Sequence, residues 1–348
     1  MKARHFKESY GQLLQLTDSA PVLVWSGLLA AGCLLLPFAF GSYALSFATL
    51  ILVMVVGVLG LNLLTGVCGL ISLGHAGFMA IGAYGAGVAA ADYGLSIIPA
   101  MLVGGAVAAA SSLLVGIPSL RLKGLYLAIT TLAFTVISTH LILNLPEITR
   151  GSAGLFLPPA NLFGIALDTP QKFFVFCLAV CGLSIVATLN IMRSRVGRAF
   201  VAIREQDIAA EMMGIHLTRY KLLAFAISAF YTGVSGALFA YHVRYINVDS
   251  FGLVLSIEAL GMIIVGGLGS ITGAVLGTVF MTLLPEAVRV LFDLFGSGLH
   301  ELFATRALEL RGLIYGAVII LVLRFQPEGL ARIWREISRV WVNWPFRY

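Results

Sequence analysis

The chain of 348 residues is 59% hydrophobic and only 11% charged, with 22 Lys and Arg residues against 16 Asp and Glu. Soluble domains carry about 25% charged residues, so this sequence lacks the polar shell of a water-soluble fold and the bilayer must solvate most of it. The formal charge of +6 does not indicate a nucleic-acid partner, because the basic residues lie in clusters between apolar runs.

The N-terminal segment, residues 1–21, is polar and carries Lys2, Arg4 and Lys7 ahead of the first apolar run. This pattern is typical of a signal-anchor helix rather than a removable signal peptide. A helix needs about 20 apolar residues to cross a bilayer, and it satisfies its own backbone hydrogen bonds there. The sequence therefore predicts an all-α, polytopic membrane protein of about ten spans, some of them interrupted by Gly, near residues 22–40, 44–64, 70–91, 96–117, 124–143, 171–192, 221–243, 252–268, 271–292 and 308–324.

Loop charges predict the orientation of these spans. Arg121 and Lys123 lie in one predicted inside loop, and five arginines lie in another, at residues 193–219. The predicted outside segments, 144–170 and 293–307, contain few basic residues. An even number of spans with both ends in the cytoplasm satisfies the positive-inside rule at each loop, whereas an odd number would place one basic end outside.

The spans form one predicted transmembrane domain, residues 22–325, followed by a tail at residues 326–348. The tail is basic and amphipathic, and it contains Trp334, so we expect a helix that lies along the cytoplasmic membrane surface. The outside segment 144–170 is rich in Pro and Gly, which predicts an irregular but ordered cap.

The inside loop at residues 193–219 is predicted to be helical, and it presents small and apolar residues rimmed by charge. Ile208, Ala209 and Ala210 precede Met212, and Gly214 follows where a left-handed C-cap is expected. An ordinary amphipathic loop helix is one explanation. A solvated loop does not require these residues to be exposed together, however, and such a surface suits docking into a groove on a partner protein.

Two Gly-rich segments, residues 66–87 and 261–277, occupy similar places in the two halves of the chain. Small residues let helices approach closely, and paired interrupted spans often flank a site at the middle of the membrane. Helix packing alone would also explain them. Cys177 and Cys181 are one helical turn apart and are interpreted as small packing residues rather than metal ligands, because no third ligand accompanies them.

His75 and Glu258 are ionisable residues within predicted spans. His75 stands between glycines near the predicted cytoplasmic start of its span, where it either titrates or contacts a substrate, or is neutral and hydrogen-bonded to a backbone carbonyl. A carboxylate at membrane depth costs about 2.5 kcal/mol or more unless it faces protein or water. Glu258 therefore either lines or gates a path, or is a hydrogen-bonded structural group near the outer interface.

Several ordered motifs together resemble those of the branched-chain amino acid importer permeases of the LivM type, over residues 40–325. They are Gly60-Leu-Asn62-Leu-Leu-Thr-Gly66, Leu70-Ile-Ser72-Leu-Gly74-His75-Ala-Gly77-Phe78, Arg121-Leu-Lys-Gly124-Leu-Tyr126, Ser256-Ile-Glu258 and Gly266-Gly267-Leu-Gly269-Ser270. In addition, Ile208-Ala209-Ala210 and Gly214 resemble the coupling motif Glu-Ala-Ala, three residues, Gly of ABC importer permeases, with Ile208 in place of the Glu. A second departure is Arg150, which stands where the family often has a glycine.

The resemblance implies a permease of the bacterial inner membrane that pairs with a related permease subunit, with two cytoplasmic ATPases that use ATP and Mg²⁺, and with a periplasmic substrate-binding protein. The implied substrate is leucine, isoleucine or valine. The residues expected to couple to the ATPases are Arg204, Glu205, Ile208, Ala209, Ala210 and Gly214. The candidates for the translocation path or its gate are Asn62, His75, Gly77, Glu258, Gly266, Gly267 and Gly269.

The sequence contains no phosphate-binding loop of its own, because none of its lysines follows a glycine. The chain is therefore predicted to be no enzyme and to bind no cofactor or metal, with ATP hydrolysed in partner subunits. The alternative is a secondary transporter driven by an ion gradient, which would need a relay of intramembrane Asp, Glu or His residues. Apart from Glu258, the central spans offer almost none.

Overall fold

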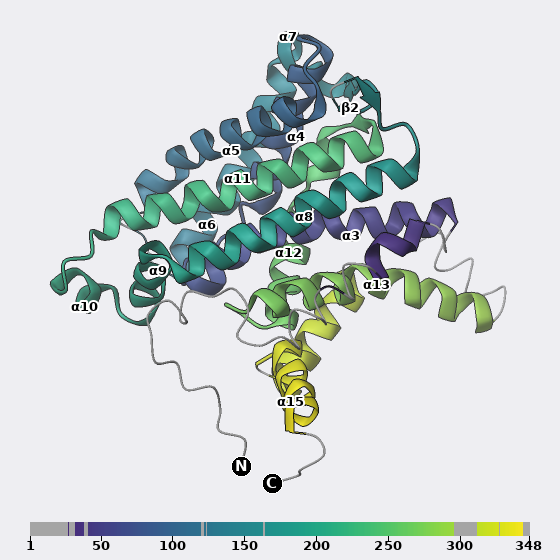
Figure 1. Ribbon diagram of the computed structural model, residues 1–348. Helices are drawn as coiled ribbons and strands as arrows, with labels where there is room; N and C mark the ends of the chain where they lie inside the picture. The colour runs from purple at the N-terminus through teal and green to yellow at the C-terminus, as the bar shows by residue number, and fades with distance from the viewer. Residues whose placement is uncertain are drawn as a thin grey trace.

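The computed structural model is a bundle of long helices that lie side by side (Figure 1). The structure describes residues 41–295 except 120, 121, 123 and 163, together with residues 27, 32–37, 312–326 and 328–343. Several predicted features therefore lie wholly or mostly outside the described residues: the segment 1–21, the span 22–40, the loop residues Arg121 and Lys123, and the outside loop 293–307.

The long helices follow the predicted spans closely. Seven of the described helices are long and apolar enough to cross a membrane, or eight if a bent pair at residues 312–336 counts as one span. The mainly helical, multi-pass architecture is thus confirmed, whereas the predicted count of ten is not. In chain order the long helices are α3 (Ser42–Leu61), α4 (His75–Ala91), α5 (Ile97–Ser119), α6 (Leu125–Asn144), α8 (Pro170–Arg193), α11 (Leu217–Val243), α12 (Leu253–Gly266), α13 (Ile271–Phe295) and Gly312–Phe325.

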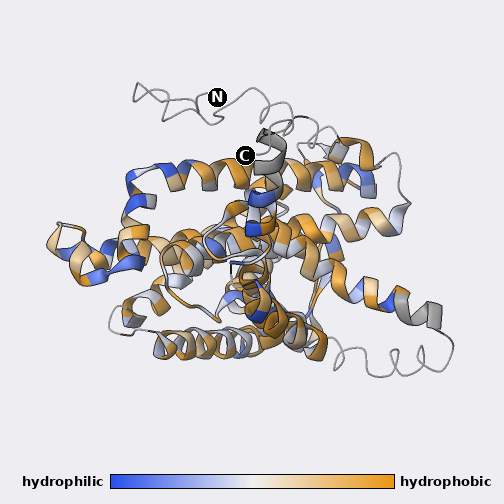
Figure 2. Ribbon diagram, turned by 90° about the horizontal axis from the view of Figure 1, so that it is seen from below, coloured by the Kyte–Doolittle hydropathy of each residue, from blue (hydrophilic) through white to orange (hydrophobic). Residues whose placement is uncertain are grey.

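Helix α11 is the centre of the bundle and packs against α3, α4 and α5. Glycines bring these backbones together. A Cβ atom added at Gly82 of α4 would overlap the backbone of Gly233 in α11, and one added at Gly236 would overlap the backbone of Met79. In lipid, where no hydrophobic force drives helices together, such small-residue contacts let van der Waals packing hold the bundle. Hydrophobic residues dominate the long helices (Figure 2).

The bundle contains two helix breaks, both in the Gly-rich segments. Helix α3 continues as a π-helix, η1 (Asn62–Val67), and the chain is not helical again until His75. The predicted span at 70–91 therefore begins as a helix five residues later than expected. The second break, residues 267–270, separates α12 from α13, and Gly267 and Gly269 adopt φ angles of 115° and 80° there. These conformations favour glycine, which has no Cβ atom to clash.

At one end of the bundle, two short helices join α8 to α11, as predicted for residues 193–219. They are α9 (Arg195–Glu205) and α10 (Asp207–Met212) (Figure 1). The side chain of Ser194 caps α9 by accepting hydrogen bonds from the N–H groups of Val196 and Gly197 at 3.1 and 3.4 Å. The helical form of this loop is thus confirmed.

Helix α10 ends in a complete Schellman motif. The N–H of Ile215 donates to the carbonyl of Ala210 at 3.1 Å, and the N–H of Gly214 donates to the carbonyl of Glu211 at 2.9 Å. Gly214 has a φ of 86°, so the predicted left-handed cap is confirmed. The cap fixes the direction in which the chain leaves α10 for α11.

The opposite end of the bundle carries the irregular but ordered segment predicted for residues 144–170. Its β1 pairs antiparallel with β4, with Leu155 opposite Ile246, and its β2 pairs antiparallel with β3. The elements of this cap are α7 (Pro146–Thr149), η2 (Gly151–Ala153), β1 (Leu155–Phe156), β2 (Asn161–Leu162), β3 (Ile165–Ala166), β4 (Tyr245–Ile246) and η3 (Val248–Phe251).

The C-terminal helix α15 (Leu330–Asn343) is amphipathic, as predicted for the tail. Ala331 is buried, whereas Ile333 and Trp334 are exposed. An amphipathic helix of this kind suits a membrane surface. Its position along the cytoplasmic surface stays a prediction.

Arg150 adopts a left-handed conformation with φ of 65°, which explains why a glycine would fit at this position. The arginine is held there by an ion pair in which its Nη2 lies 2.7 Å from Oδ1 of Asp92, just after α4. A left-handed residue other than Gly costs about 1–2 kcal/mol. An ion pair at this half-exposed site contributes about 0–1 kcal/mol, so it offsets part of that cost.

We therefore expect Arg150→Gly to leave the stability close to that of the wild type, because it removes both the strain and the ion pair. Arg150→Ala removes only the ion pair and should be less stable than Arg150→Gly by about 1 kcal/mol. Thermal unfolding of the detergent-solubilised protein measures the difference. Asp92→Asn, which removes the ion pair without touching the backbone, is the control, and equal stability of the Ala and Gly variants would contradict the strain argument.

Candidate functional site

The two helix breaks meet at a polar junction formed by Asn62. Its Oδ1 accepts a hydrogen bond from the N–H of Gly269 at 2.9 Å, and its Nδ2 donates to the carbonyl of Ser270 at 3.2 Å. Because one partner can only donate and the other can only accept, the orientation of the amide is fixed by its contacts. Asn62 thus joins the π-helix at the end of α3 to the break between α12 and α13.

Arg204, at the end of α9, reaches the same junction. Its Nη1 donates to the carbonyl of Gly66 in the π-helix. A Cβ atom added at Gly269 would lie 3.0 Å from that Nη1, and one added at Gly69 would lie 3.1 Å from the Arg204 Cγ. The glycines therefore let both breaks approach the arginine side chain. Of the residues predicted to couple to a partner, Arg204 is the one that contacts the predicted path residues.

Gly266 and Gly267 let two other segments, α13 and the chain just before α15, pack closely against the second break. A Cβ atom at Gly266 would overlap the carbonyl of Gly273 in α13, so α12 and α13 touch at this point. A Cβ atom at Gly267 would lie 2.6 Å from the carbonyl oxygen of Glu328, just before α15. The second break is thus held between Asn62 on one side and the start of the C-terminal helix on the other.

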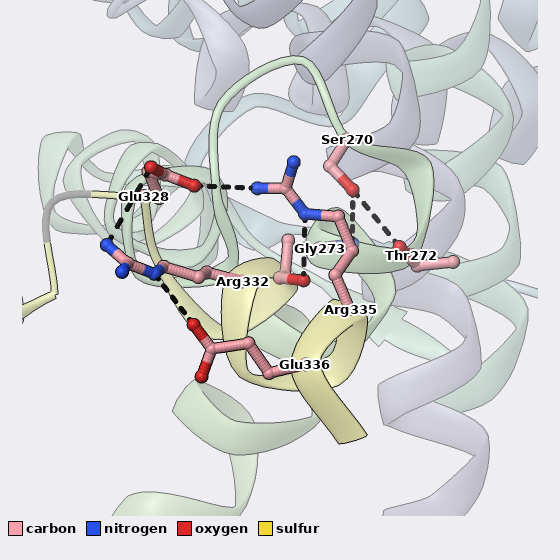
Figure 3. Close-up of polar contacts among 8 residues, drawn as sticks. Ser270, Thr272, Gly273, Glu328, Arg332, Arg335 and Glu336 are labelled. Carbon is pink, nitrogen blue, oxygen red and sulfur yellow. Dashed lines mark hydrogen bonds and ion pairs between the residues drawn. The ribbon is translucent and has the colours of Figure 1, made fainter. Parts of the chain in front are cut away.

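A cluster of ion pairs supports the start of α15 beside this break (Figure 3). Arg335 Nη2 lies 2.9 Å from Glu328 Oε2, and Arg332 Nε lies 3.0 Å from Glu336 Oε1. Figure 3 also shows Ser270, whose Oγ accepts from the N–H of Gly273 at 3.1 Å and so caps α13. The cluster ties α15 to the segment that precedes it.

His75 lies deep in the bundle. Its Nδ1 is 3.4 Å from the Oγ1 of Thr232, which is near the midpoint of the 27-residue α11. The side chain is 2% exposed. His75 is the first residue of α4, so its predicted place at the start of its span is confirmed, and the non-helical residues 68–74 separate it from the π-helix that ends α3.

Hydroxyl side chains bind the backbone of residues 68–74. The N–H of Leu73 donates to Thr131 Oγ1 at 2.8 Å, and its carbonyl accepts from Thr135 Oγ1 at 3.3 Å, both on α6. The N–H of Ala76 donates to Ser256 Oγ of α12 at 2.9 Å. A Cβ atom at Gly77 would lie 2.9 Å from the Cα of Thr135, so this glycine is needed for α4 to approach α6.

Glu258 belongs to this deeper polar layer. It is 4% exposed and follows Ser256 by two residues on α12. The carboxylate is therefore buried inside the bundle near the level of His75, and its position relative to the outer interface stays a prediction. Whether Glu258 and His75 line a path or hold the structure together stays a prediction.

The residues expected to dock a partner lie on the outer side of α9 and α10. Ile208 is 65% exposed and Met212 is 85% exposed, and Glu205 and Ala209 are also exposed. Ala210, in contrast, is buried. Of the predicted set, Ala210 is thus the buried member, whereas the other residues, Arg204 and Gly214 included, are exposed.

Lys221, on α11, also holds α10 in place. Its Nζ lies 3.7 Å from Oδ2 of Asp207 at the start of α10. The sequence analysis missed this pair, and it missed the role of Thr131 and Thr135. The spacing of four between the threonines, on an otherwise apolar helix, is a signal that could have revealed a polar face, whereas nothing in the sequence pairs Lys221 with Asp207.

A small pocket of about 160 Å³ lies at the opposite end of the bundle, where α3 and α8 begin and α11 ends. Apolar and aromatic residues, among them Leu167, Phe173 and Tyr241, line it together with Asp168 and Arg244. Cys177 and Cys181 are buried and unpaired in α8. Among the described residues, no three His, Cys, Asp or Glu side chains lie together as they would in a metal site.

We expect Asn62→Leu to destabilise the protein by about 2 kcal/mol or more, because it leaves the N–H of Gly269 and the carbonyl of Ser270 without their side-chain partner. Asn144→Leu is the matched control, since Asn144 is exposed and bonds only the carbonyl of His140 in its own helix, at 2.8 Å. Unfolding midpoints in detergent measure both variants. Equal midpoints would show that the junction does not contribute to stability.

The amino-acid sequence is similar to those of known proteins over most of the chain's length. A family model described as "Branched-chain amino acid transport system / permease component" matches residues 43–323. The high-affinity branched-chain amino acid transport system permease protein LivM of Salmonella typhimurium is 34% identical over 318 residues, which cover 84% of this chain and 71% of that protein. The LivM protein of Escherichia coli is 33% identical over the same shares.

A second type of permease from the same kind of system is also similar. The protein LivH of Escherichia coli is 28% identical over 201 residues, which cover 54% of this chain and 58% of LivH. No solved structure is significantly similar to the chain. The family match over most of the chain and its agreement with the helical bundle show that this protein belongs to the family of permease components of branched-chain amino acid transport systems.

Proposed function

We propose that the chain is one of two related permease subunits in an ATP-binding-cassette importer of the bacterial inner membrane. Two cytoplasmic ATPases dock on the pair, and a periplasmic binding protein delivers the solute. The observation that carries this proposal is the exposed surface of Ile208, Met212 and Met213 on and just after the short helix α10, which ends in a Schellman motif at one end of the bundle. In a permease, such an apolar surface rimmed by charge suits a partner groove.

The energy for transport comes from outside this chain. None of its lysines follows a glycine, so the sequence has no loop to cradle a nucleotide phosphate. The chain itself is therefore not an enzyme, and it binds neither ATP nor Mg²⁺. The end that carries α9 and α10 faces the cytoplasm, together with both chain termini, because the arginines of residues 193–219 belong inside.

The solute is leucine, isoleucine or valine. Support comes from the names of the relatives, which are permeases of branched-chain amino acid systems. The pocket near the opposite end of the bundle is lined both by apolar residues, such as Leu167 and Phe173, and by polar ones, among them Asp168 and Arg244. This combination suits a small solute with an apolar side chain and one charge of each sign.

The transport mechanism is alternating access. Nucleotide-driven closure of the ATPases displaces α9 and α10, and the interrupted helices reorient around a path between the permease subunits. The two breaks at residues 68–74 and 267–270 provide segments whose backbone is not locked into a continuous helix.

We expect Ala209→Arg to reduce recovery of the ATPases with the tagged chain at least tenfold, since a long charged side chain would occupy the exposed surface of α10. Ala210 is unsuitable for this test because it is buried and its replacement would disturb α10 itself. The measurement is mass spectrometry of the complex purified in mild detergent from its native host.

The matched control is Tyr93→Arg, which adds the same charge at a highly exposed residue just after α4, at the end of the bundle opposite to α10. It should leave recovery of the ATPases unchanged. If the wild-type chain purifies without an ATPase and takes up solute in liposomes under an ion gradient, the importer proposal is wrong and the protein is a secondary transporter.

A further inference from the structure

We propose that Arg204 transmits movement of the docking helices to the two helix breaks, and so acts as a positioning residue for the transport path. This inference rests on the proposed function, since it assigns a route by which ATPase movement reaches the path. The sequence alone places Arg204 among residues that contact a partner. Its contacts instead point inward, to the backbone of the path.

The Arg204 side chain lies against both helix breaks. Arg204 Nη1 donates to the carbonyl of Gly66 in the π-helix that ends α3. The same nitrogen lies beside Gly269 of the second break, at 3.0 Å from the position of an added Cβ atom. A planar guanidinium with several fixed donors is suited to hold two backbone segments at once, whereas a lysine ammonium presents one compact charge.

Asn62 connects the π-helix to the α12–α13 break. Asn62, one turn before Gly66, bonds both the N–H of Gly269 and the carbonyl of Ser270. A shift of Arg204 therefore acts on the π-helix directly and on the α12–α13 break through Asn62. A Cβ atom at Gly66 would overlap Asn62 Oδ1 and the backbone of Gly269, so the π-helix and the α12–α13 break are in direct contact.

Arg204 is also close in the chain to the exposed docking surface of α10. It lies at the end of α9, and only Glu205 and Gln206 separate it from α10. Phe200 and Ile203 of α9 are buried in the bundle, so α9 is anchored to the helices that it touches. Figure 1 shows α9 and α10 together at the end of the bundle. Arg204 therefore connects the chain just before α10 directly to both breaks.

A purely structural role and a transmitting role make different predictions. If Arg204 only stabilises the fold, its loss lowers the yield of assembled complex but leaves the solute imported per ATP unchanged. If it transmits movement, the complex assembles and hydrolyses ATP, but hydrolysis no longer moves the path. The decisive quantity is therefore the ratio of solute imported to ATP hydrolysed, measured on assembled complexes.

The experiment compares Arg204→Met, Arg204→Lys and Arg198→Met in the complete complex, reconstituted in liposomes with radiolabelled leucine as the probe. Arg198 is the matched control, because it is an arginine on the same helix whose Nη1 bonds only the carbonyl of Arg193, at 3.2 Å. We expect Arg204→Met to assemble with the ATPases and to lose at least tenfold in leucine imported per ATP. Arg204→Lys should lose less, and Arg198→Met should match the wild type.

Three outcomes would overturn the inference. They are a wild-type ratio in Arg204→Met, an equal loss in Arg198→Met, or failure of Arg204→Met to assemble while Arg198→Met assembles. The last would make Arg204 part of docking or folding. Absence of ATP-dependent leucine uptake in the wild-type complex would contradict the proposed function itself, and would remove the basis of this inference with it.

Discussion

The constraint on which this structure depends is that lipid offers no hydrogen-bond partner to a backbone that leaves the helix. Residues 68–74 and 267–270 expose such backbone groups within the bundle. Each break survives because side chains of other helices bind it, Thr131 and Thr135 at the first and Asn62 at the second. Several of the buried polar side chains of this apolar chain therefore serve the points where its helices are interrupted.

This constraint divides the interior into two levels. One level holds His75, Thr232 and Ser256 near the middle of the bundle, and the other holds Asn62 and Arg204 near the end that carries α9 and α10. The two levels are connected by one rigid element, because α3 passes from Val53, whose carbonyl accepts from Ser235, to the π-helix at Asn62. Helix α3 therefore joins the level of Asn62 and Arg204 to the level of His75.

The sequence predicted the parts of the fold that depend on local pattern. Long apolar runs located the helices, the loop charges and apolar positions located α9 and α10, and Gly214 located the end of α10. The depth of His75 could not be predicted in this way. It depends on the chain turning back after Val67, which requires partners on α6 that are more than fifty residues away in sequence. The pairing of Arg204 with Gly66 is equally non-local, at a separation of 138 residues.

The hydrogen bonds of Asn62 and Arg204 also explain how the contact between the two helix breaks can rearrange. An interface of interlocked apolar side chains loses its packing energy when it shifts by a fraction of a side chain. Hydrogen bonds between a guanidinium, an amide and backbone carbonyls can instead be exchanged one at a time, because neighbouring carbonyls offer equivalent acceptors. The π-helix at Asn62–Val67 adds to this, since it interrupts the α-helical hydrogen-bonding pattern of α3 just before the chain leaves the helix, and such interruptions are frequent at functional sites. Glycines at Gly66, Gly69 and Gly269 remove the side chains that would otherwise block such an exchange. The same residues that make the break tolerable in lipid thus leave it free to be repositioned.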